Sequence, residues 1–131
     1  MRATLLCAIL SVVAMTAPGC TTGAGSGRVT APIGVPIQMA PGQQVSLPDG
    51  ATLRYVEVAA DSRCPPGAQC IRAGDADVAF EFTDTAQPPR RLTINTDPPA
   101  TARIGPWRLH LLALAFGQPA IATVQIDPAT P

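Results

Sequence analysis

The sequence predicts an all-β protein, built as a single antiparallel β-sandwich behind an N-terminal signal peptide. Three observations support this. Apolar residues recur with a period of two, as in half-buried strands, and not with the 3.6 period of helices. With 15 Pro and 11 Gly in 131 residues, turn signals separate the apolar stretches at intervals of about 8–12 residues. The chain has no GxGxxG motif, no P-loop and no internal repeat, which leaves no sign of an α/β or solenoid fold.

Seven stretches carry the strand pattern, which favours an immunoglobulin-like or Greek-key sandwich of six to seven short strands. The clearest is 76–83, where Val78, Phe80 and Phe82 share one face. The first stretch contains Pro36 and is therefore expected only at a sheet edge. The segment 97–105 is expected to be a loop. The predicted strands are 35–39, 43–47, 52–59, 76–83, 91–95, 107–116 and 120–126.

The stretch 107–116 is the most apolar of these and has a helical alternative. Gly105-Pro106 before it and Gly117-Gln118-Pro119 after it are turn signals,. Trp107 and its alternate residues form one face, but the other face also contains Leu and Phe. We therefore predict a strand buried on much of both faces, with Trp107 filling the core or its rim rather than serving as a ligand platform.

The N-terminus has the three parts of a bacterial lipoprotein signal peptide. Met1-Arg2 supplies positive charge, residues 5–15 are apolar apart from one serine, and 16–19 are small residues before Cys20. The apolar run is shorter than the ~20 residues that span a bilayer. We therefore predict cleavage before Cys20 and its acylation. Thr21 in place of Asp indicates, by resemblance to sorted lipoproteins, the outer membrane facing the periplasm.

The Ala-Pro-Gly sequence before Cys20 is atypical, so cleavage by an ordinary signal peptidase to a soluble secreted protein stays an alternative. The Gly-rich stretch after Cys20 is expected to be a flexible tether. The predicted divisions are a signal peptide over 1–19, lipidated Cys20 and tether over 20–28, a β-sandwich domain over 29–127 and a tail over 128–131.

Charge argues against a nucleic-acid partner. The chain has nine basic and nine acidic residues, and all nine basic residues are Arg. No basic tract is present to neutralise phosphates. The predicted partners are therefore the lipid bilayer, through the acyl anchor, and another envelope protein.

In an oxidising compartment, each of the four cysteines has a predicted fate. Cys7 leaves with the signal peptide and Cys20 takes the lipid, which leaves Cys64 and Cys70 to form a disulfide,. A zinc site would need further ligands, and His110 is the single histidine. We predict no metal and no cofactor.

The segment 61–77 around this disulfide is the other distinctive part of the chain. It is interpreted either as a recognition loop with Asp61, Arg63 and Arg72, or as a structural staple in which Arg63 pairs with Asp61 or Asp75. Its Asp-Ser-Arg-Cys-Pro block, second Cys and Ala-Gly resemble a family of uncharacterised secreted or lipid-anchored bacterial proteins. The resemblance implies the same fold and compartment.

The candidate catalytic and metal-binding residues are few. Asp75 and Asp77, with Asp61 nearby, have oxygen ligands suited to Ca²⁺ but lack EF-hand spacing, so a solvated face is the simpler interpretation. His110 has no serine in a nucleophile-elbow context. We therefore predict no enzyme but a lipid-anchored binding or structural module. The alternatives are a secreted-protease inhibitor presenting the Cys64–Cys70 loop, and a metal-handling or enzymatic lipoprotein.

Overall fold

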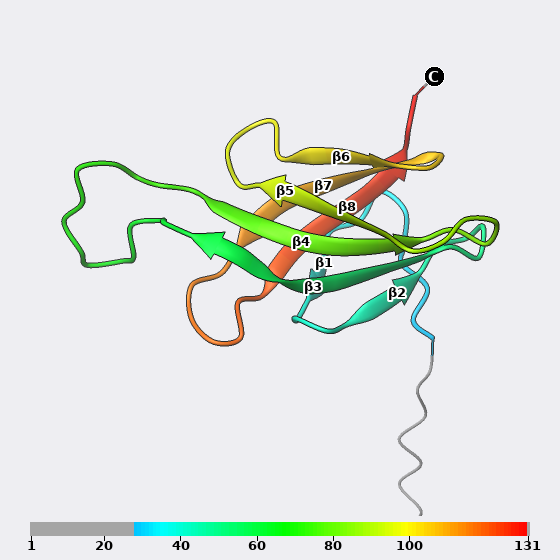
Figure 1. Ribbon diagram of the computed structural model, residues 1–131, viewed down its shortest axis with the longest axis horizontal. Helices are drawn as coiled ribbons and strands as arrows, with labels where there is room; N and C mark the ends of the chain where they lie inside the picture. Colours follow the sequence, from blue (N-terminus) through cyan, green and yellow to red (C-terminus); the bar gives the residue numbers. More distant parts are fainter. Residues whose placement is uncertain (1–27, 131) are drawn as a thin grey trace, which may run out of the picture.

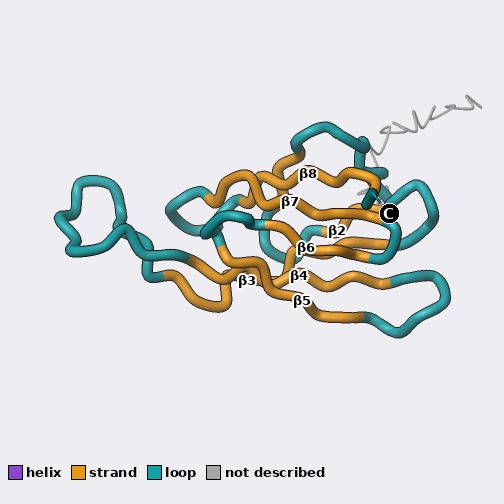
Figure 2. Tube along the Cα trace, turned by 90° about the horizontal axis from the view of Figure 1, so that it is seen from above, coloured by secondary structure: helices purple, strands orange, loops and turns teal. Residues whose placement is uncertain are grey.

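The computed structural model describes residues 28–130, which form two four-stranded antiparallel sheets packed face to face (Figures 1 and 2). The predicted signal peptide and the predicted lipidation site, Cys20, lie outside the described residues. In the described part no helix is long and apolar enough to cross a membrane. The strands are β1 (Ile37–Met39), β2 (Gln44–Ser46), β3 (Thr52–Asp61), β4 (Ala76–Thr83), β5 (Arg90–Asn95), β6 (Thr101–Ile104), β7 (Trp107–Leu114) and β8 (Ala122–Pro128).

The sandwich prediction is confirmed, with eight strands where six to seven were expected. The first sheet has the order β2-β3-β4-β5, and the second has the order β1-β8-β7-β6. Neighbouring strands are consecutive in the chain except for β1, which pairs with β8. The order is that of two meanders rather than the four-strand return that defines a Greek key. Consequently β5 and β6 are edge strands that follow each other in the chain.

The core lies between the sheets and contains the apolar residues that the alternation assigned to one face. Leu53, Tyr55 and Phe80 are fully buried there. The rings of Tyr55 and Phe80 lie 5.4 Å apart between centroids. From the second sheet, Leu109, Ile126 and other aliphatic side chains complete the core. This packing explains why a chain so poor in aromatic residues forms a sandwich of this size.

Two details of the strand predictions were wrong. The expected loop 97–105 contains β6, whose buried Ile104 packs in the core. Four residues between Pro-rich and Gly-Pro turns are too few for their alternation to stand out in the sequence. The late strand ends at Leu114 and is buried on one face only. Leu112 lies on the outer face, where it is 51% exposed, and a bulge after Leu111 turns Leu114 inward. Trp107 is partly buried against the core, as predicted, and its indole Nε1 donates to Asp49 Oδ2 over 2.8 Å.

A second bulge lies in β3, between Tyr55 and Glu57. It allows Val58 to pack against the core and Glu57 to face outward. There the Glu57 carboxylate pairs with Arg91 of β5 at 2.5 Å. Glu57 therefore belongs to a solvated outer face, and the β3 strand runs on to Asp61 at the base of the loop that follows.

Candidate functional site

The loop between β3 and β4, residues 62–75, extends beyond the rest of the sandwich (Figures 1 and 2). The predicted disulfide between Cys64 and Cys70 is present and closes it, with a Cα–Cα distance of 5.9 Å. Pro65 and Pro66 further restrict the enclosed backbone,. The loop is therefore a constrained projection and not a loose connection.

The stem of the loop continues the β3–β4 ladder. The amide of Ser62 donates to the carbonyl of Asp75 over 2.8 Å, and that of Cys64 donates to Ala73 over 2.7 Å. Gly74 is part of this stem, with a φ of +67°. A Cβ at Gly74 would overlap the carbonyl oxygen of Ser62. The close approach of the two stem strands thus requires glycine at this position.

Arg63 links the stem to the second sheet, β1-β8-β7-β6. Its guanidinium pairs with Asp61 at 2.6 Å and donates through Nη1 to the carbonyl of Leu114 over 2.5 Å. Its Nη2 also reaches the carbonyl of Ala115, at 3.5 Å, and its Cζ lies 4.1 Å from the centroid of the Phe116 ring. The Arg63 side chain is only 11% exposed. These contacts hold the β7–β8 loop, residues 115–121, against the base of the projecting loop.

The electrostatics of this pair follow from the same hydrogen bonds. The side-chain bonds from Arg63 hold the pKa of Asp61 below its ordinary value. In return, Asp61 raises the pKa of Arg63. Arg63 therefore remains charged, and its guanidinium is engaged in contacts within the protein. The Arg63–Asp61 pair expected of a structural staple is present, whereas no ion pair forms between Arg63 and Asp75.

Tyr55 makes a second attachment to the β7–β8 loop, which the sequence did not suggest. Its hydroxyl donates to the carbonyl of Ala120 over 2.8 Å. Burial raises the pKa of this hydroxyl, although the nearby Arg63 charge opposes the shift. Tyr55 looks like an ordinary core residue in the alternation, and its bond spans 65 positions. Sequence spacing carries no signal for such a contact.

The exposed side chains of this region form one end of the molecule, which we call the loop end: Pro65, Pro66, Ile71, Arg72 and Phe116. Ile71 is fully exposed, and Phe116 is 46% exposed beside Arg63. Arg72 is exposed and forms no ion pair within residues 28–130. Among the predicted recognition residues, Arg72 is exposed to solvent, whereas Arg63 is paired with Asp61 at the base of the loop.

Asp75 and Asp77, the acidic residues next to the stem, both accept hydrogen bonds from the side-chain amide of Asn95. Asn95 Nδ2 donates to Asp77 Oδ1 over 2.9 Å and also to Asp75 Oδ2. Asp61 is engaged with Arg63 instead. Over residues 28–130 no group of three or more Asp, Glu, His or Cys is placed to hold a metal ion.

His110 lies on the outer face of the second sheet. Its Nε2 is 3.3 Å from Asp127 Oδ2. Ser46 is buried in the first sheet, and Ser62 bonds to Asp75 at the loop stem. Neither serine is brought to His110, so these residues do not form a nucleophile–base pair.

No family model, no curated protein and no solved structure matches this chain. What it does is therefore inferred from its own residues and their arrangement.

Proposed function

We propose that this protein is a lipid-anchored module of the bacterial envelope that binds another envelope protein through the loop end and catalyses no reaction. The observation that carries the proposal is Ile71, a fully exposed aliphatic side chain on a loop closed by a disulfide. A flexible loop would lose conformational entropy on binding. The Cys64–Cys70 bond and the Arg63 contacts remove much of that cost in advance.

The chemistry of the loop end suits a protein partner. Ile71 and Phe116 offer separated apolar side chains; Arg72 follows Ile71 directly, and Pro65 and Pro66 lie earlier in the same loop. Interfaces typically place such apolar anchors within a polar rim, with arginine among the enriched residues. We expect a partner surface with an apolar pocket for Ile71 and a carboxylate for Arg72.

The entry point of the chain supports this orientation. Thr30 bridges to Ser46 at the end of β2, at the opposite end of the sandwich from the projecting loop (Figure 1). The proposed anchor, Cys20, precedes Thr30 by a short stretch of chain. An acyl group there would hold that end towards the bilayer and direct the loop end away from it, where a second envelope protein is reached.

Site-specific photo-crosslinking tests the interface. A photoreactive amino acid at position 71 is introduced into the full chain in its native membrane, and the same group at exposed Thr93 on the outer face of β5 serves as the matched control. We expect a discrete adduct from position 71 and none from position 93. Equal labelling from both positions, or none from position 71, would contradict a loop-end interface.

Intact mass spectrometry of membrane-extracted protein tests the anchor separately. We expect a chain starting at Cys20 with a lipid-sized increment and a two-hydrogen gain on reduction. An unlipidated mass would overturn the anchor while leaving the interface to be judged by crosslinking.

The constrained, Pro-containing loop also favours a second candidate, inhibition of a secreted protease. Because Arg63 is turned inward, the inhibitory contacts would come from Ile71 and Arg72. A protease panel with wild type, Ile71→Ala and Arg72→Ala separates the two candidates. Inhibition that both substitutions weaken would favour the inhibitor, and no inhibition would favour the envelope-binding module.

A further inference from the structure

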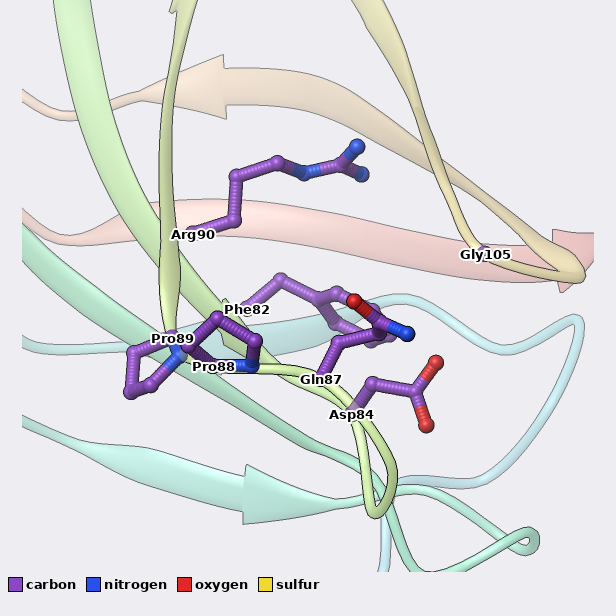
Figure 3. A pocket seen from close by; sticks show the side chains of 7 residues that line it. All are labelled: Phe82, Asp84, Gln87, Pro88, Pro89, Arg90 and Gly105. Carbon is purple, nitrogen blue, oxygen red and sulfur yellow. The ribbon is translucent and has the colours of Figure 1, made fainter.

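A pocket lies at the end of the sandwich opposite the loop end. The turn between β4 and β5 supplies Asp84, Gln87 and the Pro88-Pro89 pair, and Gly105 of the β6–β7 turn closes another side (Figure 3). Its volume is about 370 Å³, within the usual range for small-molecule sites,. Phe82 supplies an apolar surface and is itself buried, at 4% exposure.

Arg90 occupies an unusual position in this pocket. It pairs with Phe82 across the β4–β5 ladder, just as Leu92 pairs with Phe80. Alternation therefore places Arg90 on the face of β5 that points towards the second sheet. Arg90 remains exposed at this sheet edge, so its side chain borders the pocket and is accessible to a ligand.

The guanidinium of Arg90 is only partly used by the protein. Nη2 donates to the carbonyl of Arg103 over 3.3 Å, and no carboxylate pairs with Arg90 within residues 28–130. Its neighbour Arg91 points to the other face and is paired with Glu57. Arg90 thus retains donors for an anionic group of a ligand.

Asp84 supplies the opposite charge. Its Oδ1 accepts from the amide of Ala86 over 3.2 Å and from the hydroxyl of Thr85 over 3.3 Å, which fixes the turn. Its Oδ2 accepts no hydrogen bond from the described residues. Figure 3 shows the carboxylate of Asp84 and the guanidinium of Arg90 on different sides of the pocket, and the two form no ion pair.

We propose that this pocket binds a small zwitterion the size of a dipeptide. Arg90 takes the carboxylate, Asp84 takes the ammonium group, and Phe82 with the two prolines contacts the apolar body. The Gln87 amide offers a donor and an acceptor to the peptide group between the charges. A simple anion would meet the Asp84 charge and a simple cation the Arg90 charge, so a ligand carrying both charges fits best. This site is separate from the loop end and does not depend on the proposed function.

Arg90 has one competing explanation. Inward-pointing charges on edge strands discourage pairing with other chains, and β5 is an edge strand,. That role predicts self-association when Arg90 is neutralised. It does not predict ligand binding and does not involve Asp84.

Calorimetric titration of the full chain with alanyl-leucine tests the proposal. Two further probes each lack one charge: N-acetyl-alanyl-leucine has no ammonium, and alanyl-leucine amide has no carboxylate. The variants are Asp84→Asn, which is nearly isosteric, and Arg90→Gln, which keeps a shorter polar side chain without the charge. Arg91→Gln is the matched control, since it removes the same charge from the adjacent residue on the opposite face.

We expect wild type and Arg91→Gln to bind alanyl-leucine equally, and each pocket variant to bind it about tenfold more weakly. The Asp84→Asn variant should bind the acetylated probe about as well as alanyl-leucine, because it lacks the carboxylate that would contact the ammonium group. The Arg90→Gln variant should likewise bind the amidated probe about as well, because it lacks the guanidinium that would contact the carboxylate. Absence of binding to wild type at millimolar probe would overturn the proposal. Equal weakening by Arg91→Gln would also overturn it, as would self-association of Arg90→Gln with unchanged binding. Thermal melts of each variant confirm that the fold is kept.

Discussion

The two ends of this sandwich expose functional groups in different ways. At the loop end, most of the exposed side chains lie on a segment that projects from the sheets. A disulfide, a required glycine and an inward-facing arginine hold this segment in place. At the pocket end, the turns are short and the specialisation lies in Asp84 and Arg90, which do not pair with each other. The comparison indicates that substitutions of the residues that support the loop end should affect folding, whereas substitutions at the pocket end should mainly affect binding.

The largest effect is expected for Gly74→Ala. Its Cβ would overlap the Ser62 carbonyl and its φ is unfavourable for alanine, so the stem must shift at a cost of about 3 kcal/mol. Gly67→Ala is the control, because Gly67 also has positive φ but has no atom within 4 Å of the added Cβ. It should cost about 1 kcal/mol. Urea denaturation measures both, and equal losses would show that the stem moves freely.

Removal of the disulfide should have the next largest effect. Replacing Cys64 and Cys70 by serine opens a short ring, for which the chain-entropy model gives about 2.4 kcal/mol. Amide exchange should increase in the loop, while core residues such as Phe80 stay protected. Loss of protection throughout the core would show that the sandwich itself depends on this bond.

Arg63→Ala should destabilise the protein by about 2 kcal/mol, since it removes a side chain that is only 11% exposed and leaves the Leu114 carbonyl without this donor,. Arg90→Gln at the pocket end should cost about 0.5 kcal/mol or less, because its bond to Arg103 is long and exposed,. Chemical denaturation compares the two arginines directly. Similar losses would remove the distinction between the two ends.

The smallest effect concerns pH. Because hydrogen bonds from Arg63 lower the pKa of Asp61, the pair stabilises the protein fully above the ordinary Asp pKa of 3.8. This contribution is lost as pH falls through the lower folded-state pKa. Asp61 is 36% exposed, so solvent screening limits the effect to about 0.5 kcal/mol,. The stability gap between wild type and Asp61→Asn should therefore narrow in acid; a gap that widens would contradict the pairing.

The sequence predicted the parts that depend on local pattern. Period-two alternation located most strands, and cysteine arithmetic identified Cys64–Cys70. β6 was missed because four residues show too little alternation. The inward placement of Arg63 against the β7–β8 loop could not be predicted, since its main-chain acceptors there lie about fifty positions away. The pocket was missed for the same reason: the significance of Arg90 appears only once its pairing with Phe82 is known.

The attachment of the β7–β8 loop has a consequence for protein engineering. Arg63 and Tyr55 hold this loop through the carbonyls of Leu114, Ala115 and Ala120. Main-chain acceptors are present whatever side chains the loop carries. Exposed positions such as Ala115 and Gln118 are therefore suited to randomisation in a display library, because the side chains at these positions are not part of the attachment.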